Sequence, residues 1–319
     1  MKIAILDDYQ SVAKDMADWD SLQEAEVEFF SDHLSNEEQI ADRLREFDIV
    51  MGMRERTPFP KTLIEKLPNL KLLITSGARN ASFDLDAATK QGVMVCGTPG
   101  QGEGPAELTW GLILALLRNI PQEDTQTRKG HWGTSLGIGL EGKTLGILGL
   151  GHIGSLVARV GNAFGMNIIA WSTNLTADRA SECNAKLVDK TALFAQSDIV
   201  SIHVRLSERT HGLVGQKELE LMKATAYLIN ISRGPIVDET SLVQALASNA
   251  IAGAGLDTFD IEPLPNEHPL LKLNNTVITP HIGYVTKEGY SAFYEGVVEN
   301  IRGFLSGEPI RVINKEVLQ

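Results

Sequence analysis

Short apolar runs alternate with amphipathic stretches through the first hundred residues of the chain. The runs are rich in Ile, Leu, Val and Met, and they lie at residues 2–6, 27–30, 48–53, 71–75 and 93–96. Start signals mark the helices between them, because residues 35–38 form a capping box before 39–47 and Pro60 opens a helical stretch over 61–66. Strands that alternate with helices are typical of parallel sheets, so the pattern predicts one α/β domain here.

The pattern is interrupted at residues 97–102, where Gly and Pro cluster, and a long helical stretch over 105–118 follows. We predict a hinge at this interruption. The alternation resumes at Lys143, with strands expected at 144–148, 167–171, 198–203, 226–231, 253–257 and 276–278. This second series predicts a second doubly wound parallel sheet.

The last part of the chain differs from both series. Residues 286–305 carry apolar side chains at helical spacing, and Gly307 is a typical stop signal for a helix. We expect no strand after this helix, and we predict that it packs back on the first domain.

Composition and charge narrow the class of protein. The chain has 319 residues, of which 43% are hydrophobic and 22% charged, a balance typical of a soluble protein with two domains. Its formal net charge of −12 offers no basic field for nucleic acid or an anionic membrane. Asp7 and Asp8 follow the first apolar run at once, unlike a signal peptide, and no run approaches the roughly 20 residues that span a bilayer. We therefore expect a cytoplasmic protein that binds neither nucleic acid nor membrane.

Cysteine and histidine positions give no sign of a metal centre. Cys96 and Cys183 each stand alone in their segments, so neither a disulfide framework nor a Cys-based metal site is expected. The histidines without an expected site role lack metal-ligand spacing and are predicted to lie at the surface or to cap helices; they are His33, His131, His211 and His268. No metal is predicted.

Residues 149–154, Gly-Leu-Gly-His-Ile-Gly, match the glycine pattern of dinucleotide-binding turns. An apolar strand precedes them and a helical stretch follows, as this mechanism requires. Gly149 allows the tight turn, Gly151 lets the backbone approach the pyrophosphate, and Gly154 lets helix and strand pack closely. His152 and Ile153 are expected to contribute backbone N–H groups. A purely structural turn is the alternative interpretation.

The residues that end the next strand bear on the choice of cofactor. NAD-preferring proteins place an acidic residue about 20 positions after the glycines, where it holds the ribose hydroxyls. Here the strand ends in Ser172-Thr173-Asn174, which carries no carboxylate to repel a 2′-phosphate. No arginine stands beside these residues in the sequence, since Arg179 comes several positions later. The cofactor is therefore NAD or NADP, and NADP tolerance or preference is a hypothesis.

Three further segments identify a family. Residues 230–239, 255–264 and 279–283, together with 149–154, resemble the signatures of the D-isomer-specific 2-hydroxyacid dehydrogenases. Glyoxylate/hydroxypyruvate reductases and phosphoglycerate dehydrogenases belong to this family. The segments stand in the same order and at similar spacing, and the resemblance covers nearly the whole chain.

The resemblance implies a Rossmann dinucleotide-binding domain over 99–283, inserted in a flavodoxin-like substrate domain made of 1–98 and 284–319. It also implies an oxidoreductase that transfers hydride between NAD(P)H and a small 2-keto acid to give a D-2-hydroxy acid. Substrates of the glyoxylate or hydroxypyruvate type are favoured, and the keto acid is expected to bind in the cleft between the domains.

Three residues of the matching segments are the expected catalytic group. Arg233 offers a planar fork of donors for the substrate carboxylate and the ketone oxygen. His281 is expected to donate a proton to that oxygen as hydride arrives. Glu262 is expected to bond the other imidazole nitrogen, fixing its orientation and favouring the protonated form. Each residue taken alone has an ordinary structural explanation. Together, however, the three residues lie at the carboxyl ends of proposed strands, where open α/β sheets bind ligands.

Other positions are expected to border the cofactor. By the resemblance, Asp257 accepts a hydrogen bond from the nicotinamide carboxamide, although a structural capping role is an alternative. His203 and Val204 are expected beside the adenosine. Arg205 replaces a proline common in the family, which is either a second hint of a 2′-phosphate or a solvated surface residue. The remaining expected contacts are Thr210, Ile231, Ser232, Arg233, His281 and Gly283.

The substrate pocket is predicted less specifically. Residues 76–79, Ser76-Gly77-Ala78-Arg79, resemble the family's substrate loop, whose backbone N–H groups meet the carboxylate, and Gly77 permits the close approach. Arg54 and Arg56 end another strand of the same domain and are either substrate ligands or surface residues. Tyr284 is expected to form an aromatic wall of the pocket.

The competing enzyme functions are those of related dehydrogenases. Formate, phosphite and phosphoglycerate dehydrogenases keep related Arg, Glu and His positions. An NAD-sensing corepressor-type binding protein is the alternative outside catalysis. The resemblance also implies a homodimer through the dinucleotide-binding domain, with 105–118 and the loop around Trp132 as candidate contacts.

Overall fold

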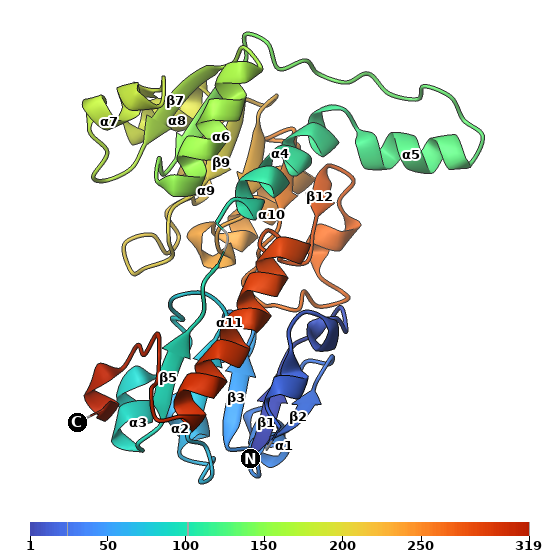
Figure 1. Ribbon diagram of the computed structural model, residues 1–319. Helices are drawn as coiled ribbons and strands as arrows, with labels where there is room; N and C mark the ends of the chain where they lie inside the picture. Colours follow the sequence, from blue (N-terminus) through green and yellow to red (C-terminus); the bar gives the residue numbers. More distant parts are fainter. Residues whose placement is uncertain (24, 101, 319) are drawn as a thin grey trace. The chain divides into compact units, whose positions relative to one another are not determined.

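The computed structural model describes residues 1–23, 25–100 and 102–318 (Figure 1). Its contacts divide the chain into two compact units, the first formed by Met1–Gln101 with Val285–Gln319 and the second by Gly102–Tyr284. The sequence had placed the breaks after residues 98 and 283. The predicted hinge at 97–102 contains Gln101, which lies outside the described residues.

The first unit contains a five-stranded parallel sheet. Its strands are β1 (Lys2–Ile5), β2 (Glu26–Phe29), β3 (Ile49–Gly52), β4 (Leu72–Thr75) and β5 (Met94–Gly97). Their order, β2-β1-β3-β4-β5, is that of flavodoxin-like folds. The central strands β3 and β4 are buried along their whole length, which explains their continuous apolar runs. The predicted α/β domain is confirmed.

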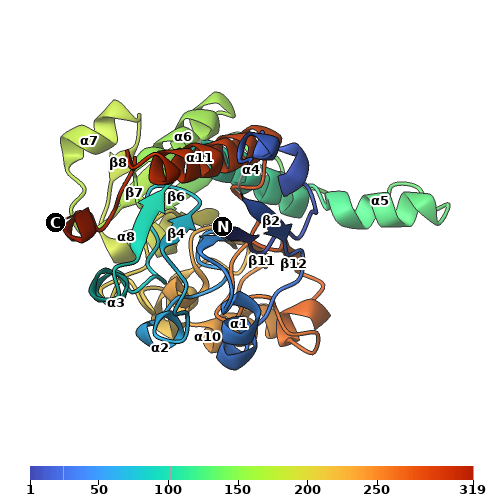
Figure 2. The ribbon, with the colours of Figure 1, turned by 60° about the horizontal axis from the view of Figure 1, so that its bottom comes forward.

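Helices cover both faces of this sheet. They are α1 (Glu37–Leu44), α2 (Lys61–Ile64), α3 (Leu85–Lys90) and α11 (Lys287–Leu305). Figure 2 shows α11 on one face and the three short helices on the other. The core on the latter side joins apolar residues of α1, α2 and α3 to alternate residues of the strands.

The predicted capping box at 35–38 is wrong. Asn36, not Ser35, is the N-cap residue of α1, and its side-chain oxygen accepts hydrogen bonds from the backbone N–H groups of Glu38 (3.0 Å) and Gln39 (3.1 Å). One amide oxygen therefore serves two free helix donors at once. The helix begins at Glu37, two residues earlier than expected.

The predicted terminal helix is confirmed as α11. Thr286 caps its start by accepting a hydrogen bond from the N–H of Gly289, and Gly307 (φ +76°) follows its end. Residues 285–319, which include α11, belong to the first unit. The segment after α11 then pairs with the edge strand β5, where the N–H of Ile313 donates to the carbonyl of Val95 (2.7 Å). This pairing covers a strand edge that would otherwise be open.

The second unit contains a seven-stranded parallel sheet. Its strands are β6 (Thr144–Leu148), β7 (Asn167–Trp171), β8 (Lys186–Leu187), β9 (Ile199–Ile202), β10 (Tyr227–Asn230), β11 (Gly253–Leu256) and β12 (Thr276–Ile278). The order β8-β7-β6-β9-β10-β11-β12 is the doubly wound order of Rossmann folds, extended by one strand. The chain reverses direction across the sheet between β6 and β9, and ligands bind at such switch points.

Helices also cover both faces of the second sheet. The helices of this unit, of which α5 does not cover the sheet, are α4 (Gly104–Leu117), α5 (Ile120–Arg128), α6 (His152–Ala163), α7 (Ala177–Glu182), α8 (Lys190–Gln196), α9 (Gln216–Leu221) and α10 (Glu239–Ala247). One apolar core contains residues of α4 and α6, and the other contains residues of α8, α9 and α10. Within the described ranges, no helix is both long and apolar enough to span a bilayer.

Helix α5 and the stretch after it stand apart from both cores. No residue of α5 is buried, and Figure 1 shows the helix and the following loop projecting from the sheet of their own unit. Trp132 is 89% exposed and Leu136 is 93% exposed. Large apolar side chains on a projecting arm are typical of a surface that binds another protein.

Candidate active site

The three expected catalytic residues follow three neighbouring strands. Arg233 lies after β10, Glu262 in the loop after β11, and His281 after β12, and these strands are adjacent in the parallel sheet. Because the carboxyl ends of parallel strands share one edge, the three loops begin at the same edge of the sheet. The sequence motifs are therefore brought to one place by the strand order.

Glu262 and His281 form a direct pair. The Nδ1 atom of His281 lies 2.6 Å from Oε2 of Glu262, and Oε1 of Glu262 accepts a hydrogen bond from the N–H of Phe259 (2.9 Å). Both carboxylate oxygens are thus engaged, which fixes the carboxylate and through it the imidazole. His281 has φ +53°, a left-handed conformation that is costly for a non-glycine residue. Such strain is typical of positions where a precise orientation is needed.

Buried hydrogen bonds hold the turn that carries Arg233. The Asn230 side chain is 1% exposed, donates to the carbonyl of Arg233 (3.0 Å) and accepts from the N–H of Ser232 (3.0 Å). The guanidinium of Arg233 donates to the carbonyl of Ser232 (2.7 Å). A Cβ at Gly234 would lie 2.0 Å from the carbonyl carbon of Phe259. Gly234 therefore lets the Arg233 turn pack directly against the loop that carries Glu262.

Asp257 holds the turn that carries His281. It is fully buried, and it accepts hydrogen bonds from the Thr279 hydroxyl (2.7 Å) and from the N–H groups of Ile282 (2.8 Å) and Gly283 (2.9 Å). Burial raises the pKa of Asp257 above the usual range of an aspartate. These contacts agree with the structural capping role that the sequence offers as the alternative for Asp257. The carboxamide contact stays a prediction.

Tyr284 lies beside His281, and its place in the substrate pocket stays a prediction. The two rings meet edge to face, with centroids 5.5 Å apart and planes at 81°. An aromatic ring in this position limits the orientations open to the imidazole.

A second carboxylate–imidazole pair was not foreseen. Oε1 of Glu239 lies 2.9 Å from Nε2 of His268, and Oε2 accepts a hydrogen bond from the N–H of Asp260 (3.4 Å). Nδ1 of His268 accepts from the N–H of Leu270, so His268 caps a short 3-10 helix, as predicted for this histidine. Burial and the neighbouring Glu239 raise the pKa of Asp260. Glu239 therefore ties α10 to the loop that carries Glu262.

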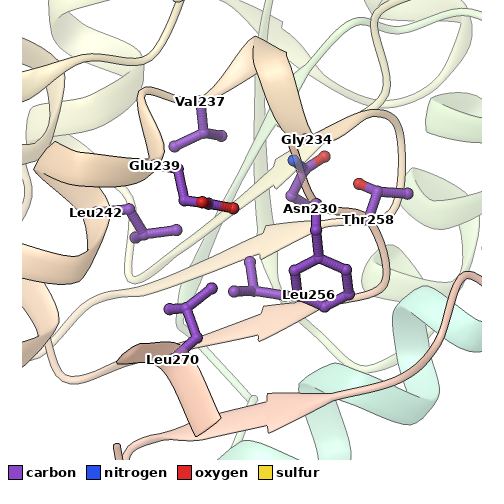
Figure 3. Close-up of a pocket in the computed structure, with 9 residues that line it drawn as sticks. Asn230, Gly234, Val237, Glu239, Leu242, Leu256, Thr258 and Leu270 are labelled. Carbon is purple, nitrogen blue, oxygen red and sulfur yellow. The ribbon is translucent and has the colours of Figure 1, made fainter. Parts of the chain in front are cut away.

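A small cavity of about 10 Å³ lies beneath these loops (Figure 3). Its lining residues come from β10, β11, α10 and the turns after them; they are Asn230, Gly234, Val237, Glu239, Leu242, Leu256, Thr258, Phe259 and Leu270. The volume admits about one water molecule and no substrate. The Thr258 hydroxyl is buried and has no partner among the described residues, so a water here would satisfy it.

The glycine turn has the geometry of a dinucleotide cradle. Gly149 has φ +102°, and a Cβ there would lie 2.8 Å from the Val204 side chain. A Cβ at Gly154 would lie 2.1 Å from the carbonyl oxygen of Gly149, whereas a Cβ at Gly151 would meet open space. The first and third glycines therefore serve packing, and the second leaves room outside the turn. These residues fit a pyrophosphate at the start of α6.

The predicted adenosine-side residues are held in different ways. The His203 ring is half-buried with Nε2 2.8 Å from the Ser201 hydroxyl, and desolvation lowers its pKa to about 3, so it is neutral at ordinary pH. The Thr210 hydroxyl donates to the carbonyl of exposed Arg205 (2.6 Å) and so closes the turn after β9. Ser232 donates from its hydroxyl to the carbonyl of Ile202 (2.8 Å).

Ile231 is buried, while Thr173 and Asn174 are exposed and Ser172 is half-buried.

In the first unit, Arg54 and the predicted substrate loop lie together. The N–H of Arg54 donates to the Ser76 hydroxyl (2.8 Å), and its guanidinium donates to the Ser76 carbonyl (3.2 Å). Gly77 has φ +84°, and a Cβ there would lie 2.1 Å from Nη1 of Arg54. Glycine is therefore required for the guanidinium to cross the loop, and Arg54 itself adopts φ +53°.

The other residues of this region differ in their contacts. Ala78 and Arg79 are exposed, whereas the N–H groups of Ser76 and Gly77 already donate to the carbonyl of Gly52 (3.2 Å) and to the Thr98 hydroxyl (2.8 Å). Arg56 is engaged within the fold, because its guanidinium donates to the carbonyl of Asp7 (2.7 Å) and lies 4.2 Å from the centre of the Tyr9 ring. Of the two arginines, Arg54 is the better placed beside the loop.

A glycine turn at the switch point of a Rossmann sheet, with a carboxylate–imidazole pair at the same edge, defines a nicotinamide dinucleotide-dependent oxidoreductase. Residues 110–283 match the model of the family described as D-isomer specific 2-hydroxyacid dehydrogenase, NAD binding domain. The chain belongs to this family, and the resemblance stated from its motifs is confirmed.

Known relatives extend the similarity to the whole chain. The glyoxylate reductase of Thermococcus litoralis is 40% identical over 290 residues, which cover 88% of this chain and 87% of the relative. A putative D-3-phosphoglycerate dehydrogenase oxidoreductase from Ralstonia solanacearum has 37% identity and a TM-score of 0.94 over 100% of this chain and 98% of that one. An acyclic imino acid reductase in complex with NADPH and D-Arg has 32% identity and a TM-score of 0.76, covering 98% of this chain and 100% of its own.

Proposed function

We propose that this protein reduces small 2-keto acids to D-2-hydroxy acids with NADPH or NADH, and that glyoxylate or hydroxypyruvate is the favoured substrate. The observation that carries the proposal is the 2.6 Å contact between Glu262 and His281, at the sheet edge where the Arg233 turn begins. The 40% identity to a protein named glyoxylate reductase supports the choice of substrate.

Each of the three residues has one task in this proposal. Arg233 holds the substrate carboxylate and polarises the ketone oxygen through its planar donor fork. His281 gives the proton from Nε2 to that oxygen, because Nδ1 is committed to Glu262. Glu262 orients the ring through this contact. The bound reduced dinucleotide supplies the hydride that the carbonyl carbon receives.

Further residues are proposed to bind substrate and cofactor. Arg54 offers a guanidinium and the exposed residues Ala78 and Arg79 offer backbone N–H groups to a carboxylate, and Tyr284 limits the room beside His281. The N–H groups of the glycine turn are proposed to hold the pyrophosphate. Because Ser172, Thr173 and Asn174 carry no negative charge, a 2′-phosphate is not repelled there.

Oxidation of 3-phosphoglycerate is the second candidate function. The name of the Ralstonia relative favours it, and so does Arg54, a second guanidinium suited to a phosphate. The two candidates differ in the substrate pocket and not in the proposed catalytic group.

A panel of acids tested with each cofactor decides between them. Glyoxylate, hydroxypyruvate, pyruvate, phosphohydroxypyruvate and aromatic keto acids are to be tested as oxidants of NADH and NADPH, with formate and phosphite as reductants of NAD and NADP. We expect the highest kcat/KM with glyoxylate or hydroxypyruvate. A higher value with phosphohydroxypyruvate would select the second candidate. No turnover with any compound would overturn both and favour a dinucleotide-sensing binding protein, which pulldown of partners with and without NAD(H) would detect.

The variant Arg233→Ala links the activity to the proposed site. We expect a higher KM for the keto acid and a lower kcat, with the affinity for NADH within about twofold of wild type because the glycine turn is untouched. Loss of cofactor binding in this variant would contradict the assigned role.

We also propose that the protein is a homodimer through its second unit, with α4 and the loop around Trp132 at the interface. The exposed Trp132 and Leu136 on the projecting arm support this arrangement. Sedimentation equilibrium is expected to give twice the chain mass for wild type, and Trp132→Ser is expected to weaken the association. A monomeric wild type at micromolar concentration would refute it.

A further inference from the structure

The side chain of Arg179 reaches from α7 to the helix that begins at the glycine turn. Its Nη2 atom donates to the Ser155 hydroxyl (2.9 Å), and that hydroxyl donates to the carbonyl of Gly151 (2.7 Å). Ser155 lies in the first turns of α6, one residue after the last glycine of the motif. The guanidinium is therefore two hydrogen bonds away from Gly151, although Arg179 is 28 residues away in sequence.

This guanidinium lies at the start of α6, the helix that follows the glycine turn. In Rossmann folds the residue that ends the second strand faces the ribose hydroxyls, next to the glycine turn. Here the first residue after that strand is Ser172, and the N–H of Leu175 donates to its carbonyl (3.1 Å), so the chain turns back at once toward the start of α7. The turn explains how an arginine seven positions after Ser172 returns to the glycine loop.

Arg179 is also available to an anion. Its Nη1 atom pairs with Glu182 (2.8 Å), but the two side chains are 46% and 63% exposed, and such exposed pairs stabilise little. A phosphate with two negative charges is a stronger partner for a guanidinium than one exposed carboxylate. The Ser155 hydroxyl holds the guanidinium in place, so little side-chain freedom is lost when a ligand binds.

We infer that Arg179, with the Ser172 and Thr173 side chains, binds the 2′-phosphate of the cofactor and makes the protein select NADPH over NADH. This inference rests on the proposed dehydrogenase function and adds a residue that determines its cofactor. Arg179 follows Ser172 in the sequence, and its hydrogen bond to Ser155 places its guanidinium beside the helix that begins at the glycine turn.

Binding of cofactor fragments tests the inference without turnover. Adenosine 2′,5′-bisphosphate and adenosine 5′-monophosphate are titrated calorimetrically into wild type, Arg179→Ala and the matched control Arg128→Ala, whose exposed arginine pairs with Asp124 in α5. We expect wild type and Arg128→Ala to bind the bisphosphate about tenfold or more tightly than the monophosphate. Arg179→Ala is expected to lose this preference and to keep its affinity for the monophosphate within about twofold.

A second variant gives an effect of opposite sign. Glu182→Gln removes the competing carboxylate, so we expect it to strengthen NADPH binding by about twofold to fivefold and leave NADH binding unchanged. Equal loss of both fragments in Arg179→Ala would assign the residue a purely structural role and overturn the inference. Equal affinity of wild type for both fragments would overturn it too, while the dehydrogenase proposal would stand. Failure of wild type to bind either NADH or NADPH would overturn the proposed function itself.

Discussion

Two carboxylate–imidazole pairs involve the loops at the carboxyl end of the second sheet. In the first, His281 bonds Glu262 through Nδ1, and Nε2 has no protein partner among the described residues. In the second, His268 bonds Glu239 through Nε2 and accepts the N–H of Leu270 at Nδ1, so both ring nitrogens are used. The residue types are identical, and the difference lies in whether one nitrogen remains for a substrate.

The backbone conformation at the two histidines also differs. His268 lies at φ −60°, an ordinary conformation for a helix cap, whereas His281 is held at φ +53° by a turn that the buried Asp257 fixes through three hydrogen bonds. Of the two histidines, only His281 has a strained backbone conformation that several buried hydrogen bonds hold in place. We infer that a carboxylate–imidazole pair is suited to proton transfer when the fold constrains its orientation and leaves one ring nitrogen open.

The largest expected effect comes from the open imidazole. His281→Gln removes the proton donor and keeps the approximate shape, so we expect kcat for keto-acid reduction to fall by about 10²–10⁴-fold. His268→Gln is the matched control, and its kcat is expected to stay within about threefold of wild type. Steady-state kinetics with NADH and NADPH measure both. Comparable losses in the two variants would remove the functional distinction between the pairs.

The next largest effect concerns the carboxylate that orients His281. Glu262→Gln can still hold the ring but places no negative charge beside it, so we expect kcat for reduction to fall by about tenfold or more. Steady-state kinetics with NADH and NADPH measure the loss. An unchanged kcat would contradict a role for the Glu262 carboxylate in turnover.

A third imidazole, His203, is expected to affect stability and not turnover. Its pKa falls from 6.5 to about 3 on burial, so the unfolded chain takes up a proton that the folded chain does not. Stability is therefore lost as pH falls from about 6.5 toward 3, with a slope of up to about 1.4 kcal/mol per pH unit. His203→Asn is expected to flatten this slope in urea unfolding, whereas the exposed His131→Asn leaves it unchanged. Identical slopes in wild type and His203→Asn would contradict burial of a neutral ring.

Much of the fold was predictable because its signals are local. The strands at 144–148, 167–171 and 276–278 were predicted to the residue, since each is an apolar run between polar or glycine-rich turns. Helix α5 was missed because it has no buried face and therefore no apolar period, and β8 was missed because it has only two residues. Burial patterns predict elements only where the elements are buried.

The candidate site shows the same limit. Arg233, Glu262 and His281 stand in recognisable motifs, so the sequence alone picked them out. The pairing of Glu239 with His268 joins residues 29 apart in sequence, and the role of Gly234 depends on a backbone that approaches it from another loop. Such contacts form only when the fold brings distant segments of the chain together, so no local sequence pattern indicates them.

The smallest expected effect belongs to the closed pair. Glu239→Gln keeps a side-chain oxygen for the N–H of Asp260 but weakens the bond to His268, so we expect a loss of about 1 kcal/mol in the free energy of unfolding. Turnover is expected to remain within about threefold, since the Glu262 loop stays anchored by the Phe259 N–H. Urea unfolding and kinetics on the same preparation separate the two readouts. A loss of kcat as large as that of Glu262→Gln, without loss of stability, would place Glu239 in the proton-transfer machinery and erase the distinction between the open and the closed pair.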